Sequence, residues 1–134
     1  MSDTLDDTTL LAQFESLALP PAAFHHREHV RVAFAILRAT GDFALAAQRF
    51  RTALLRFADA IGATGKYHET LTWAYLALVH ERMAERDYAT SLELLAAHPD
   101  LLDHEGGALA RYYDVAAVTA SPLARRVFVL PLRS

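Results

Sequence analysis

The sequence predicts an all-α protein, a compact antiparallel bundle of about five to six helices with an extended C-terminal tail. Apolar residues recur at steps of three and four along most of the chain, as on the buried face of an amphipathic helix. Proline, glycine and capping residues interrupt this pattern at short intervals, which indicates short helices with short connections. The chain has 134 residues, 53% hydrophobic and 22% charged, so we expect residues 1–134 to form a single helical domain.

The first expected helix is short. Aspartate and threonine at residues 6–9 can cap its start, and Leu10, Phe14 and Leu17 would share its apolar face. The proline pair at 20–21 ends it, because proline cannot continue a helix.

The next two helices have clearer ends. One is expected from about His26 to Thr40, with Gly41 after its last residue. The other follows Asp42 as its N-cap and ends at Gly62. Its apolar residues recur at helical spacing: Phe43, Ala47, Phe50, Leu54, Phe57 and Ile61.

The second half of the chain begins with a helix that is apolar nearly all round, from about Tyr67 to Glu85, which we expect to be the most buried one. Shorter helices are expected over residues 89–97 and 106–117. After one helical turn, the stretch 126–131 should lie across the bundle or form a lone strand.

Short connections make successive helices antiparallel neighbours, so the starts of the second and fourth helices should lie at the same end of the bundle. His26 and His29 begin the second helix, and His68 begins the fourth. We therefore expect these three side chains to meet. His80 lies twelve residues further on, about 18 Å along the helix, and cannot share their site.

The leading hypothesis is a metal-dependent enzyme that acts on a small metabolite. His26, His29 and His68 are the predicted metal ligands, because three imidazoles suit Zn²⁺ or Fe²⁺ and leave a coordination position open. Glu69 is the predicted fourth ligand or general base, and Tyr75 the second catalytic residue.

Three further residues are predicted to bind substrate. Lys66 is a cation beside the starts of two helices, whose partial positive charge also favours anions. Tyr67 follows it, and Thr72 shares a helix face with His68 and Tyr75.

Two alternatives stay open. The first is a metal-free pocket for a small anionic ligand, with histidine as general acid or base. The second is a non-catalytic interaction module whose histidines are simply packed, since a buried histidine usually only makes hydrogen bonds.

A peptidase-like pattern is also present and is disfavoured. Residues 25–29 read H-x-x-E-H, which matches a zinc-peptidase motif. The proline pair lies just upstream, so we expect His25 to precede the first full helical turn and to lie off the buried face.

Composition excludes several classes. The net charge of −3 offers no basic face for nucleic acid, and the absence of cysteine excludes disulfides and thiolate chemistry. The acidic N-terminus has no signal-peptide pattern, and no apolar run reaches the roughly 20 residues of a membrane span. We expect a soluble cytoplasmic protein whose partner is a small molecule, with a homodimer as an open alternative.

Three stretches carry a resemblance. Residues 24–31 (FHHREHVR), 66–75 (KYHETLTWAY) and 128–131 (FVLP) resemble the F-x-H-x-x-H-V and K-Y-H-E-T-x-T motifs of a family of small, uncharacterised bacterial all-helical proteins. The resemblance covers most of the chain and implies no particular activity. The matching positions are Phe24, His26, His29, Lys66, Tyr67, His68, Glu69 and Thr70.

Overall fold

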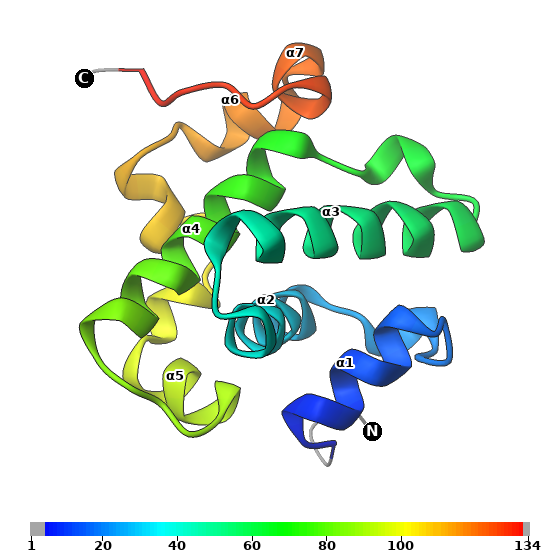
Figure 1. Ribbon diagram of the computed structural model, residues 1–134. Coiled ribbons are helices and arrows are strands. Elements are labelled where there is room, and N and C mark those ends of the chain that lie inside the picture. Colours follow the sequence, from blue (N-terminus) through cyan, green and yellow to red (C-terminus); the bar gives the residue numbers. More distant parts are fainter. Residues whose placement is uncertain (1–4, 133–134) are drawn as a thin grey trace.

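The computed structural model describes residues 5–132 and confirms the all-α fold class, with no strand in that range (Figure 1). Short 3₁₀ turns at Pro21–Ala23, Thr64–Lys66, Pro99–Leu101 and Ala108–Arg111 connect the longer helices. The α-helices are α1 (Asp7–Glu15), α2 (His26–Thr40), α3 (Phe43–Ala60), α4 (Glu69–Glu85), α5 (Ser91–Ala97), α6 (Val115–Ala120) and α7 (Pro122–Arg126).

The junction between α2 and α3 follows the predicted capping. Gly41 ends α2 in the left-handed conformation with φ +66°, which glycine adopts without steric cost. The Asp42 side chain then accepts a hydrogen bond of 2.9 Å from the Leu45 N–H and caps α3. Helix α1 ends earlier than expected, so Leu17 lies beyond it and is 40% exposed rather than buried.

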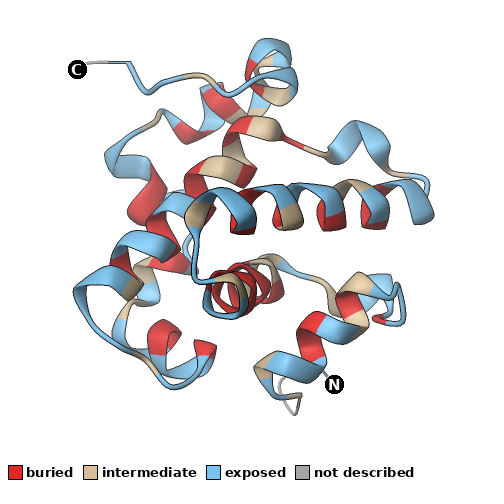
Figure 2. Ribbon diagram, in the orientation of Figure 1, coloured by how far each residue is buried: buried red, intermediate tan, exposed pale blue. Residues whose placement is uncertain are grey.

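Helix α2, rather than α4, is the most enclosed element. It packs against α1, α3, α4 and α5, and every residue from Val30 to Leu37 is buried. In Figure 1 it is seen end-on with α3 lying across it, so these consecutive helices cross at a large angle and are not antiparallel as expected. Figure 2 shows that the inner faces of the surrounding helices are buried and their outer faces exposed.

The helix predicted over 106–117 is wrong in its extent, because the chain there forms a 3₁₀ turn, a loop and then α6. A Cβ on Gly107 would lie 2.1 Å from the Asp100 carbonyl oxygen, so the turn requires glycine at this close approach. Asp114 then accepts a hydrogen bond of 3.1 Å from the Ala117 N–H and starts a separate helix.

The C-terminal segment from Val127 is extended and lies across the start of α4, as expected. The Thr70 hydroxyl donates to the Val127 carbonyl at 2.8 Å and accepts from the Val129 N–H at 3.0 Å. The Tyr113 hydroxyl donates to the Val129 carbonyl at 2.8 Å. These three bonds hold the segment without a partner strand.

Within residues 5–132, none of the helices has the length and apolar character needed to cross a membrane.

Candidate functional site

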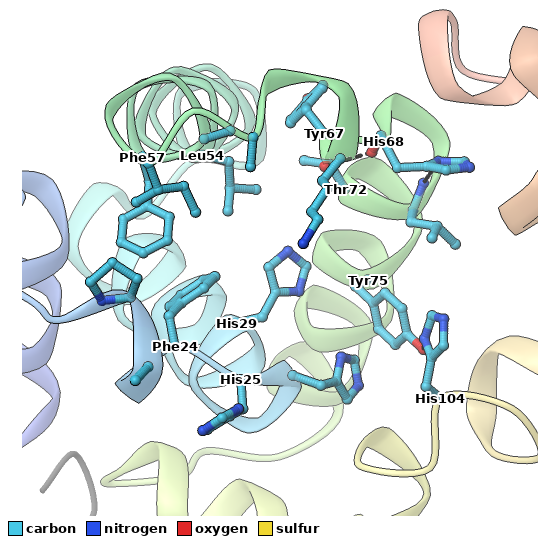
Figure 3. A pocket seen from close by; sticks show the side chains of 18 residues that line it. Phe24, His25, His29, Leu54, Phe57, Tyr67, His68, Thr72, Tyr75 and His104 are labelled. Atoms are coloured by element: carbon cyan, nitrogen blue, oxygen red, sulfur yellow. Dashed lines mark hydrogen bonds between the residues drawn. The ribbon is translucent and has the colours of Figure 1, made fainter.

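A pocket of about 650 Å³ opens where the starts of α2 and α4 approach each other (Figure 3). Helix α3 contributes one wall, and the loop before Ala108 contributes His104. Seven of the eight predicted site residues line this pocket: His26, His29, Lys66, Tyr67, His68, Thr72 and Tyr75. The expectation that the two helix starts meet is therefore fulfilled in the fold.

His25 and Glu28 have a capping role at the start of α2. The His25 backbone N–H donates to the Glu28 carboxylate at 2.9 Å, which forms part of a capping box. The His25 side chain is exposed, whereas Glu28 is buried. These positions do not fit a zinc-peptidase H-x-x-E-H motif, in agreement with the sequence-based expectation.

His26 is held in one tautomer. Its Nε2–H donates to the Leu101 carbonyl at 2.8 Å, and because a carbonyl can only accept, Nδ1 carries the lone pair. Burial lowers the pKa of His26, and nearby His104 lowers it further, against the raising effect of the Leu101 bond. The ring is therefore neutral near pH 7, with Nδ1 as an acceptor.

His29 lies one helical turn further on and is directed into the pocket, as Figure 3 shows. Its ring contacts Phe50 at a centroid distance of 5.1 Å and the edge of Phe24 at 6.1 Å. No described residue forms a hydrogen bond with either ring nitrogen. Burial, with smaller effects of His26 and His104, lowers its pKa to about 3, so this imidazole is also neutral.

Tyr75 and His104 form a pair on the floor of the pocket. The Tyr75 hydroxyl and His104 Nδ1 are 2.7 Å apart in a hydrogen bond. The His26 ring stands edge-on to Tyr75 at 4.7 Å and lies 5.4 Å from His104, centroid to centroid. Burial, with a smaller effect of Asp103, raises the pKa of Tyr75, so its hydroxyl stays protonated.

His104 was not predicted as a site residue. It lies in the loop between two 3₁₀ turns, outside every helical pattern, and only the fold carries it to α4. A histidine among turn residues offered no periodic signal that could have identified it.

His68 has a structural role in this arrangement. Its Nδ1 accepts from the Leu71 N–H at 3.1 Å as the N-cap of α4, and its Nε2–H donates to the Val118 carbonyl at 2.8 Å. The residue is only 6% exposed, and burial lowers its pKa. Both ring nitrogens are therefore engaged, which leaves no lone pair for a metal ion.

Glu69 does not line the pocket. Its carboxylate accepts from the Tyr67 hydroxyl at 2.7 Å and from Arg51 Nε at 2.9 Å. Burial would raise the pKa of Glu69, but these hydrogen bonds outweigh it and hold the pKa below its usual value. The predicted role as fourth ligand or base does not fit this outward position.

The remaining predicted residues differ in exposure: Thr72 is buried, Tyr67 is half-buried and Lys66 is exposed. The Tyr67 hydroxyl is used by Glu69, and burial together with this bond raises the pKa of Tyr67. Thr72 donates back to the His68 carbonyl at 2.8 Å, an ordinary helical contact. Lys66 lines the pocket and is exposed.

The predicted three-histidine ligand set does not fit these side-chain positions. Among the described residues, no group of three or more histidine, aspartate or glutamate side chains is arranged to hold a metal ion. His26 and His29 keep acceptor nitrogens, but His68 would have to give up both of its bonds. Metal binding therefore stays a prediction.

The pocket has one apolar side and one polar side. Phe24, Leu54, Phe57 and Ile61 form an apolar side, and the imidazoles with Tyr75 form the polar side. The described lining residues include no carboxylate, but they do include the cationic Lys66. A ligand with an apolar body and a negative group would match both sides.

Comparisons of this chain with protein families, with curated proteins and with solved structures found no match.

Proposed function

We propose that this protein binds a small organic anion with an apolar body in the pocket between α2 and α4. The observation that carries the proposal is the His29 imidazole, which faces the pocket while neither of its nitrogens has a partner among the described residues. The ring is half-buried, so both nitrogens can form hydrogen bonds with a ligand that enters the pocket.

The preference for an anion rests on the pocket lining. Lys66 provides positive charge at the opening, and no described carboxylate opposes it. Neutral imidazoles can donate a hydrogen bond to an anionic oxygen through their N–H groups. The volume of about 650 Å³ lies in the range typical of small-molecule sites.

The same geometry supports acid–base chemistry on the bound molecule. His26 has its Nε2–H fixed on the Leu101 carbonyl, so Nδ1 is the proton acceptor of the site. His29 orients the ligand, and the Tyr75–His104 pair presents a polar group beside it. Tyr75 thus keeps its predicted catalytic role, and His26 replaces Glu69 as the proposed base.

The test is a thermal-stability titration with benzoate and hexanoate, each compared with its neutral amide. We expect saturable stabilisation by the carboxylates, about 1.4 kcal/mol at ten times Kd, and little by the amides. His29→Leu should abolish this effect, and Lys66→Met should reduce the preference for the charged ligand. His80→Gln, on the exposed face of α4, is the control.

Two outcomes would contradict the proposal. Equal stabilisation by acid and amide would remove the anion preference. Carboxylate binding that persists in folded His29→Leu would place the ligand elsewhere.

A metal centre is the second candidate. Metal-bound histidines usually donate their second N–H to a carbonyl or carboxylate, as His26 does to Leu101. The same titration, run with Zn²⁺ and Fe²⁺ on chelator-treated protein and combined with elemental analysis, tests it. Stoichiometric metal that is lost in a His26→Ala, His29→Ala double variant would favour this candidate over the metal-free pocket.

A further inference from the structure

A second hollow lies on another side of α4 and shares no lining residue with the histidine pocket. It has a volume of about 360 Å³ and is lined by α4, the start of α3, the segment after Ala108 and the C-terminal segment. Five of its eleven lining residues are aromatic, although aromatic residues make up only 10% of the chain. The aromatic side chains are Phe43, Trp73, Tyr112, Tyr113 and Phe128.

These rings come from separate segments and are not simply stacked into the core. Phe43 and Trp73 meet at a centroid distance of 6.3 Å and an angle of 55°, so neither ring fully covers a face of the other. Tyr112 is 47% exposed and Phe128 is 45% exposed. Aromatic surface therefore remains available to a ligand.

The orientation of two rings is set by their polar atoms. The Tyr113 hydroxyl donates to the Val129 carbonyl at 2.8 Å. The Trp73 indole interacts with the Glu69 carboxylate and helps to lower the pKa of Glu69. What these residues offer to the hollow is the π surface of their rings.

Glu81 is the only charged residue among the described lining residues. It lies on the exposed side of α4 and makes no salt bridge with any described residue, while its neighbour Arg82 pairs with Asp100 at 3.1 Å. A carboxylate beside several aromatic rings produces a negative potential, since ring faces are themselves negative.

The geometry points to a binding site for a small alkylated ammonium ion, held by the rings of Trp73 and Tyr112 and by the carboxylate of Glu81. A quaternary ammonium group combines apolar methyl groups with a positive charge, so it matches an aromatic lining that a hydrated metal ion or an anion would not. This site is independent of the pocket at the histidines, because the two share no lining residue.

Trp73 is the only tryptophan of the chain, so all tryptophan emission comes from a ring that lines this hollow. The experiment titrates the protein with choline at constant ionic strength. The comparison ligand is its neutral isostere, in which a tert-butyl group replaces the trimethylammonium group. We expect a saturable change in Trp73 emission with choline in the millimolar range and binding at least about tenfold weaker for the isostere.

Single-residue variants measure how much Glu81 and Tyr112 each contribute to choline binding. Glu81→Gln should weaken choline binding about fivefold, as expected for one exposed charge. Tyr112→Leu keeps an apolar side chain without the π face and should also weaken it, while Glu93→Gln, an exposed carboxylate on α5, should not. Equal binding of choline and its isostere would show that the hollow binds apolar groups without regard to charge, and would overturn the inference. So would the absence of a saturable response in the folded wild-type protein.

Discussion

At the scale of single residues, the partner of each ring nitrogen decides what a histidine can do. His68 uses both nitrogens inside the protein, His26 uses one, and His29 uses none among the described residues. These three residues looked equivalent as predicted metal ligands. Their hydrogen bonds give them different roles. His68 caps a helix, His26 has one oriented acceptor nitrogen, and His29 can bind a ligand through either nitrogen.

The half-buried His29 imidazole leads to a prediction about the stability of the protein in acid. Its pKa is about 3 in the folded protein and 6.5 when unperturbed, so between these values the unfolded chain binds more protons. The stability is then complete above about pH 6.5 and falls as the pH drops through this window, by up to about 1.4 kcal/mol per pH unit. Urea unfolding should therefore show a loss of about 2 kcal/mol from His29 at pH 5.

His29→Gln cannot take up this proton and should show a shallower loss of unfolding free energy on acidification. His26, whose pKa is also lowered, will retain part of the slope. Thr52→Val, an exposed change on α3 that involves no titratable group, should match the wild-type slope. An unchanged slope in His29→Gln would show that His29 is not buried in its neutral form.

At the scale of elements, the helix starts define the pocket. Helix α2 begins with the His25–Glu28 capping box, and α4 begins with the His68 side chain as its cap. A cap fixes the first turn of its helix, which holds His26 on α2 and Thr72 on α4 in place. The local capping contacts therefore position the residues that face the ligand.

Two substitutions of His68 test whether its side chain stabilises the protein as the cap of α4. His68→Ala removes the cap and also the bond to the Val118 carbonyl, which keeps only its hydrogen bond from the Ser121 N–H. This should cost about 2 kcal/mol of unfolding free energy. His68→Asn keeps a capping acceptor and should recover about 1 kcal/mol. Chemical denaturation of both variants provides the measurement, and equal stability of the two would argue against the cap.

At the scale of the whole molecule, segments far apart in sequence complete both hollows. His104 reaches Tyr75 from 29 residues away, and Val127 reaches Thr70 from 57 residues away. The C-terminal segment also contributes Phe128 to the aromatic hollow. Its attachment to α4 is therefore a condition for that second site.

Thr70→Val tests this attachment, because valine has nearly the same shape but no hydroxyl. We expect a loss of about 2 kcal/mol and faster hydrogen exchange at the Val129 amide, whose bond to Thr70 is removed. Thr52→Val, on the exposed face of α3, should change neither quantity. Undiminished protection at Val129 would mean that the segment is held by other contacts.

By itself, the sequence determined the all-α fold, the bounds of α2, the Asp42 cap of α3 and the meeting of the helix starts at one end. The first three features depend on helical periodicity and on caps, which act within a few residues, and the fourth depends on the short connections between the helices. Only the tertiary structure decided that Glu69 faces Arg51, that His104 joins the pocket and that His68 has no free nitrogen. The reason is distance along the chain. The carbonyls that engage His26 and His68 lie 75 and 50 residues away, and no local pattern encodes their approach.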